Sequence, residues 1–188
     1  MDFGTIRSIK GDTILSPSLP RLGIRISAGF IYLGNLHYIS SDIYHVEQYI
    51  FIDPNGIGHV TRVLLIQFTG FLENKEGRYE FPAQPSVLLD GEEYHYEESI
   101  LNIDDFARHL PHTELGHASD YIRQRSYTLA GEMRCQRFAR AIGEHQRNEL
   151  AITYLEAPEE SGASAPAPAE SGAAPEIDRA LSSFTIVH

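Results

Sequence analysis

The stretch that most restricts the fold is residues 59–72, HVTRVLLIQFTGFL, the longest run in the chain that is typical of a β-strand. It is rich in β-branched and aromatic residues, which suit the pleated, half-buried surface of a sheet. The sequence DPNG at 53–56 comes shortly before it, and Asn-Gly tolerates the positive φ values that tight hairpin turns require. We therefore expect residues 43–52 to pair antiparallel with this strand in a hairpin.

Turn residues mark further strands on both sides of this hairpin. Residues 23–39 are rich in Ile, Phe and Tyr, and bends are expected at Gly29 and at Gly34-Asn35. The remaining predicted strands are 79–81, 87–89, 92–101 after the Asp90-Gly91 turn, 133–142, and 150–155 after the loop GEHQRN.

A helical insertion interrupts the strands. Asn102 or Asp104 can cap a short helix that Pro111 ends, and Thr113 can open a second one. The second helix carries apolar residues on one face: Leu115, Ala118 and Ile122. Two short helices are therefore expected over about 103–127, before the last two strands.

Together these elements predict a mainly β (α+β) fold with about seven or eight strands, mostly joined to their neighbours along the chain. The sequence shows no repeated alternation of strand and helix, so a parallel sheet is not expected. The pattern favours an antiparallel β-barrel or a strongly curved sheet, with the helices covering one end or face.

Composition changes sharply at Ala157. Residues 1–156 have the composition of one β-rich, barrel-like domain, whereas 157–176 are rich in Ala, Pro, Ser, Gly and Glu. Such a segment buries too little apolar surface to offset its ordering entropy, so it is predicted to be a disordered linker. Apolar residues return at 177–188. This short C-terminal segment can fold back on the domain, dock on another protein, or remain weakly structured.

Charge and cysteine content narrow the partners and the location. The net charge of −11 disfavours nucleic acid and anionic membrane surfaces as partners. The basic residues Arg134, Arg137 and Arg140 stand close together and are expected to form surface ion pairs. A single cysteine, Cys135, and the lack of a signal-peptide pattern predict a cytoplasmic protein. No particular cofactor is indicated.

A short echo in the sequence suggests a site. Residues 44–47 read YHVE and residues 94–97 read YHYE, both within predicted strands. In a strand, side chains two residues apart lie on one face, roughly 7 Å apart, so each copy can present a His and a Glu together. Two copies facing across a barrel would supply ligands suited to Zn, Mn or Fe, or an acid–base pair. The alternative is ordinary strand polarity, since cross-strand His–Glu pairs are common.

Other candidate sites are weaker. His109, His112 and His117 cross a helix break at Pro111, so helix-terminus and loop roles explain them better than a metal site. In the long strand, one face is almost wholly apolar while the other includes Gln67 and Thr69. That pattern fits a wall facing a cavity with sparse polar groups.

Three functions follow from these features. The first is a small-molecule-binding β-barrel that holds an apolar or aromatic ligand, with candidate ligand-binding residues Tyr44, His45, Gln67, Thr69, Tyr94 and His95. The second is a metal-assisted or acid–base enzyme, with His45 and Glu47 as catalytic residues and His95 and Glu97 as further candidates for metal binding or proton transfer. The third is an interaction module whose C-terminal segment docks on a partner protein through Phe184, Ile186 and Val187.

Overall fold

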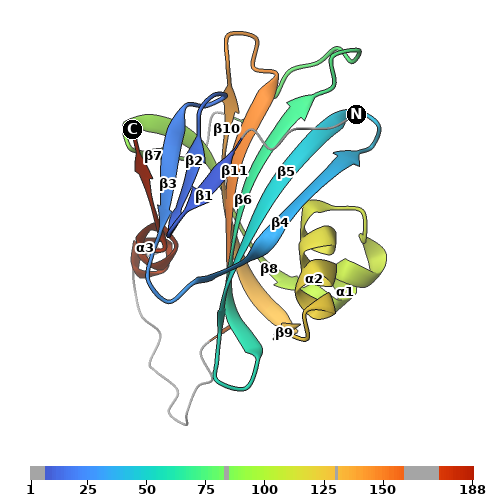
Figure 1. The fold of residues 1–188 in the computed structure, drawn as a ribbon, viewed down its shortest axis with the longest axis vertical. Coiled ribbons are helices and arrows are strands. Elements are labelled where there is room, and N and C mark those ends of the chain that lie inside the picture. The colour runs from blue at the N-terminus through green and yellow to red at the C-terminus, as the bar shows by residue number, and fades with distance from the viewer. Residues whose placement is uncertain (1–6, 83–84, 130, 159–173) are drawn as a thin grey trace.

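A computed structural model describes residues 7–82, 85–129, 131–158 and 174–188, and it places their strands in two sheets (Figure 1). The strand order of the large sheet is β4-β5-β6-β11-β10-β8-β7, and β9 pairs with β6. Its strands are β4 (Ile31–Ser40), β5 (Tyr44–Pro54), β6 (His59–Phe71), β7 (Ser86–Leu89), β8 (Glu92–Asn102), β9 (Thr128–Leu129), β10 (Glu132–Ile142) and β11 (Asn148–Glu156).

The small sheet joins the two ends of the described chain. Its order is β1-β2-β3-β12, with every neighbouring pair antiparallel. Its strands are β1 (Ser8–Lys10), β2 (Thr13–Ser16), β3 (Leu22–Ile26) and β12 (Phe184–Val187). The predicted strand 23–39 is therefore two strands in different sheets. The break contains Gly29, whose φ of 104° is costly for residues with a Cβ.

The helical insertion is present where the sequence places it. Helix α1 (Ile103–His109) is capped by the side chain of Asn102, which accepts a hydrogen bond from the Asp105 amide at 3.0 Å. Helix α2 (Glu114–Gln124) is capped by Thr113 in the same way. A third helix, α3 (Ala174–Ser182), directly precedes β12.

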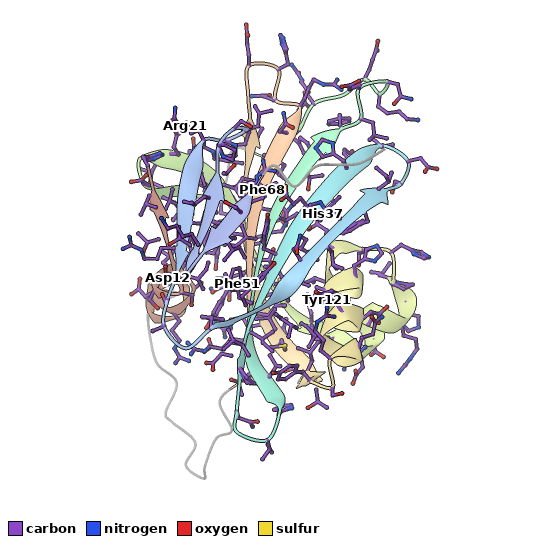
Figure 2. All side chains as sticks on the ribbon, in the orientation of Figure 1. Asp12, Arg21, His37, Phe51, Phe68 and Tyr121 are labelled. Atoms are coloured by element: carbon purple, nitrogen blue, oxygen red, sulfur yellow. The ribbon has the colours of Figure 1, made fainter. Side chains whose placement is uncertain are left out.

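The large sheet separates two apolar layers. One layer fills the space between the two sheets and includes Phe51, Phe68 and Phe138, together with Ala180 of α3 and Phe184 of β12. Phe51 and Phe68 are labelled in Figure 2. The other layer lies under α1 and α2, and its main members are Ile50, Val63, Leu65, Ile103, Ile122 and Met133. We call the two sides of the large sheet the small-sheet face and the helix face.

The expected barrel is not confirmed, because neither sheet is closed among the described residues: β4 and β7 end the large sheet without pairing with each other. The broader prediction of a mostly β fold with large antiparallel sheets and a helical insertion is confirmed. The hairpin β5–β6 and the pair β10–β11 also form as predicted.

The C-terminal segment folds back on the domain. Phe184 is 5% exposed, and β12 pairs with β3 from Phe184↔Ile26 to Val187↔Gly23. Most of the predicted linker, residues 159–173, lies outside the described part of the chain. Across the described residues, no helix is both long enough and apolar enough to span a membrane.

Candidate functional site: a polar cluster on the helix face

The His–Glu pairs of the two echoed motifs lie on opposite faces of the large sheet. In β5, Tyr49 pairs with Ile66 and points with it into the layer between the sheets, so His45 and Glu47, also at odd positions, share that small-sheet face. In β8, Tyr96 pairs with Phe138 on the same small-sheet face. His95 and Glu97 therefore point to the helix face, and the four side chains do not converge.

Glu47 is held in a fixed network on the small-sheet face. Its carboxylate accepts a hydrogen bond from Arg7 Nη1 at 2.6 Å and one from the Tyr49 hydroxyl at 2.5 Å. Arg7 also lies over the Phe68 ring, 3.7 Å from its centroid, and donates to the Leu19 carbonyl. Both charged residues are buried. This network ties the N-terminal segment to the large sheet.

His45 lies close to this network on the same face. A Cβ added at Gly70 would collide with the His45 ring and the Asn148 side chain, so the imidazole occupies space that a glycine leaves free. Burial, followed by the positive charge of Arg7, lowers the pKa of His45. The His45 imidazole therefore stays neutral down to a lower pH than a free histidine does.

On the helix face, His95 is buried and lies between two partners. Its Nε2 is 3.1 Å from Glu97 Oε1, and the Phe81 ring stacks on it with a centroid distance of 5.6 Å and an interplanar angle of 19°. Within the described residues, His95 Nδ1 is buried without a hydrogen-bond partner. Buried polar atoms are nearly always paired, so this nitrogen calls for an explanation.

A chain of amide and hydroxyl groups faces the same side from β5 and β6. Gln48 Nε2 donates to Gln67 Oε1 at 3.0 Å, and Gln67 Nε2 donates to Thr69 Oγ1 at 3.0 Å. Gln48 Nε2 also approaches the Glu114 carbonyl at the start of α2, at 3.3 Å. Gln48 Oε1 has no partner among the described residues, although Gln48 is only 1% exposed.

A partly buried ion pair lies between these groups and His95. Arg137 Nη2 donates to Glu149 Oε1 at 2.6 Å. Between them the two strands carry the paired residues Ala139 and Ala151, whose small side chains leave room for the ion pair above the sheet. Gln67 pairs with Ala151, and His95 pairs with Ala139, so both flank it.

Burial dominates the electrostatics of this ion pair. It raises the pKa of Glu149; Arg137 opposes that shift, and the negative charges of Glu114 and Glu97 add to it. A carboxyl so placed gives up its proton less readily than an ordinary glutamate.

The loop of residues 72–82, which we call the strap, covers these polar side chains. Its residue Tyr79 donates its backbone N–H to the Gln146 carbonyl at 2.8 Å, and Arg147 Nη2 donates to the strap carbonyls of Leu72 and Lys75. Tyr79 packs its ring against Phe71, and its hydroxyl is buried without a partner in the described chain. Burial, and then the charge of Glu149, raise the pKa of Tyr79.

A hollow of about 690 Å³ lies between the strap and strands β8 and β10. Its lining includes Tyr79 and Phe81 of the strap and His95 and Ala139 of the sheet, so it reaches two of the buried polar groups, Tyr79 and His95. We call this hollow the strap pocket. The polar cluster is defined as Gln48, Gln67, Thr69, Tyr79, His95, Arg137 and Glu149.

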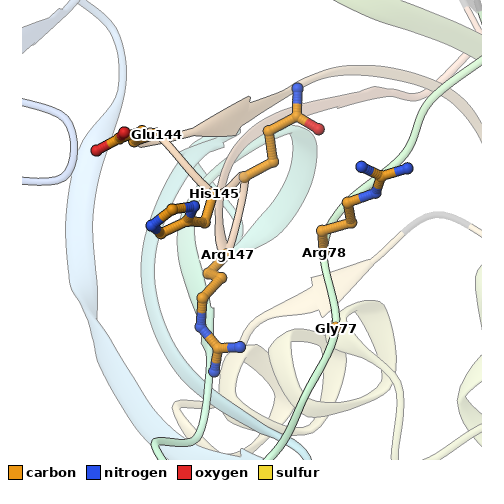
Figure 3. A pocket seen from close by; sticks show the side chains of 6 residues that line it. Gly77, Arg78, Glu144, His145 and Arg147 are labelled. Carbon is orange, nitrogen blue, oxygen red and sulfur yellow. The ribbon is translucent and has the colours of Figure 1, made fainter.

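A second hollow, also about 690 Å³, lies at the end of the β10–β11 hairpin (Figure 3). Its lining is Gly77, Arg78, Glu144, His145, Gln146 and Arg147. These residues are mostly exposed, and Arg147 is engaged by strap carbonyls. This hollow marks where the strap is anchored, and it contains none of the buried polar atoms that lack a partner.

The residues predicted for ligand binding divide between the faces. Gln67, Thr69 and His95 belong to the polar cluster, and Tyr44 packs beside it, 5.8 Å from the Tyr79 ring. His45 and Tyr94 lie on the small-sheet face. Among the residues that the structure describes, no group of three or more His, Cys, Asp or Glu side chains is close enough to hold a metal ion.

Sequence reasoning missed Arg137, Glu149, Gln48 and Tyr79. The three arginines were expected to pair at the surface, and Arg134 and Arg140 do pair with Glu98 and Glu92. Arg137 differs in parity from both, so it points to the opposite face. Only that odd spacing within the arginine group signalled a different role.

Comparison with protein families, characterised proteins and solved structures finds no match for this chain.

Proposed function

We propose that this protein binds a small molecule in the strap pocket, with the polar cluster as the recognition surface. The observation that carries the proposal is that two side chains lining this pocket, Tyr79 and His95, each have a buried polar atom, Tyr79 OH and His95 Nδ1, without a partner among the described residues. Leaving such an atom unpaired costs about 1–3 kcal/mol, and a ligand that pairs with it recovers that cost.

The ligand is best described as a small molecule with a polar group and an apolar or aromatic body. The polar group faces the cluster, and the body lies against Tyr79 and Phe81 of the strap. This ligand is more polar than the apolar or aromatic ligand expected from the sequence. We do not propose the enzyme in which His45 and Glu47 act together with His95 and Glu97, because these two His–Glu pairs lie on opposite faces of the large sheet. We also propose a cytoplasmic location, since the only cysteine is a buried free thiol.

The variant Tyr79→Phe tests the proposal, because it removes only the unpartnered hydroxyl and keeps the ring. Without a ligand, its melting temperature should equal or exceed that of the wild type, since an unpaired buried hydroxyl destabilises the fold. Its affinity for compounds that stabilise the wild type in a thermal-shift screen should fall roughly fivefold to tenfold, as expected for the loss of one hydrogen bond.

Tyr38→Phe is the matched control. The Tyr38 hydroxyl is also buried without a partner in the described residues, but its ring packs against His117 of α2, away from the strap. Ligand affinity should be unchanged in this variant. If both variants bind equally well, or if no compound stabilises the wild type, the strap pocket is not a binding site.

A further inference from the structure

We infer that the ligand of the strap pocket is a small organic cation, such as an amine, whose ammonium group is received by the polar cluster. This inference rests on the proposed function and names the chemical class of its ligand. Three observations support it: the balance of charge, the kind of hydrogen-bonding atom left unpaired, and the aromatic cover.

Carboxylates outnumber arginines around the site. The residues that line the strap pocket or act electrostatically on Glu149 include three arginines and six carboxylates, counting Glu149 itself. Each arginine is engaged by one carboxylate: Arg78 with Glu80, Arg140 with Glu92, and Arg137 with Glu149. Three carboxylates remain beyond these ion pairs: Glu93, Glu97 and Glu114. The surplus attracts a positive charge and repels an anion.

The unpaired atoms are suited to a hydrogen-bond donor. The Tyr79 hydroxyl can accept a hydrogen bond, and His95 Nδ1 accepts when Nε2–H donates to the Glu97 carboxylate. An ammonium group offers three N–H donors and no acceptor, which complements such a set. A carboxylate or phosphate would place acceptors against the accepting His95 Nδ1.

Aromatic rings supply the third feature. Phe81 and Tyr79 line the pocket, and Tyr44 packs against Tyr79 behind them. Ring faces attract cations and also accommodate an apolar body, so an organic cation uses both properties. The pocket is not suited to a bare metal ion, because the described residues contain no group of three or more metal-ligating side chains.

The test uses three probes with one shared body and different charges: phenethylammonium, 2-phenylethanol and 3-phenylpropionate. Calorimetry measures their affinities for the full chain, and amide shifts in a ¹⁵N–¹H correlation spectrum locate binding. Phenethylammonium should bind at least about tenfold more tightly than the alcohol, with shifts at the strap, β8 and β10, and more weakly at high salt. The propionate should not bind there.

Two adjacent residues provide a matched pair of variants. Glu97→Gln removes a carboxylate on the helix face, whereas Glu98→Gln removes one on the small-sheet face and changes the net charge equally. Both side chains are at least 36% exposed, so both variants should fold. Glu97→Gln should weaken phenethylammonium binding about threefold to tenfold, and Glu98→Gln should leave it nearly unchanged.

The outcomes separate the two proposals. If the alcohol or the propionate binds the same amides more tightly than the ammonium, the cation inference is overturned while the strap pocket stands as a binding site. Equal weakening by Glu97→Gln and Glu98→Gln would show general attraction to an acidic protein and would also overturn it. If none of the probes shifts the strap amides at millimolar concentration, both proposals are contradicted.

Discussion

At the residue scale, the described residues hold a largely buried ion pair on each face of the large sheet. Arg7–Glu47 lies on the small-sheet face, and Arg137–Glu149 lies on the helix face. The first pair is fully enclosed in protein hydrogen bonds, whereas the second is bordered by polar atoms that lack partners. This contrast distinguishes a structural network from a candidate binding site.

The Arg7–Glu47 pair gives a stability prediction. Arg7→Met should lower the free energy of unfolding by about 3–5 kcal/mol, because it leaves the Glu47 carboxylate buried and without its cation. Urea unfolding followed by circular dichroism measures the change. Adding Glu47→Gln should recover part of the loss. A single variant within about 0.5 kcal/mol of the wild type would show that the pair does not hold the N-terminal segment.

His45 gives a prediction on pH dependence. Its folded pKa lies below the ordinary value of 6.5, so the unfolded state takes up the proton first. Its contribution to stability is therefore present above pH 6.5 and is lost as the pH falls through 6.5 towards the lower folded pKa. His45→Gln should reduce the loss of unfolding free energy between about pH 7 and pH 5, measured by urea unfolding at each pH. An unchanged slope would exclude this role.

How much of the site could be predicted depended on strand register. The sequence pointed to Gln67 and Thr69, because polar residues on a strand with one apolar face stand out, and to His95 through the YHYE echo. It could not pair them with Arg137 and Glu149, since those contacts depend on which strands are neighbours. A shift of one residue would have moved each side chain to the other face.

At the element scale, local signals were strongest where turns are tight. The turn at 53–56 and the Asp90-Gly91 turn both join strands as predicted, and Asp90 and Gly91 have φ values of 51° and 80°. The strand 133–142, which does not follow a helical pattern, is also observed. The division of residues 23–39 between two sheets was missed, because local sequence marks a bend but does not show that the strands part.

The C-terminal segment carries the prediction at this scale. Phe184→Ala should cost about 3–5 kcal/mol, because its ring is buried between the sheets, 6.1 Å from the Phe138 ring. Thermal and urea unfolding measure the loss. Thr185→Ala, at the exposed neighbouring position, should have little effect. Nearly equal stability for the two variants would mean that β12 does not complete the core in solution.

At the scale of the whole molecule, the large sheet is a central layer with different covers on its two faces (Figure 1). The small sheet and α3 cover one face, while α1, α2 and the strap lie against the other. The long strand has one almost wholly apolar face and one mixed face, a pattern that fits a barrel wall facing a cavity. A barrel requires the edge strands to meet, and that depends on long-range geometry, so local patterns could not decide it.

The pairing of β3 with β12 has a consequence for how the molecule is made. During synthesis, Ile24 and Ile26 leave the ribosome long before Phe184 and Ile186, the residues that lie opposite or beside them. Until then, the inner surface of the small sheet lacks one of its strands, and apolar side chains of the nascent chain stay uncovered. The assembled layer must therefore form late, after β12 has been translated, and a newly made chain that stalls before residue 184 would be a substrate for chaperones.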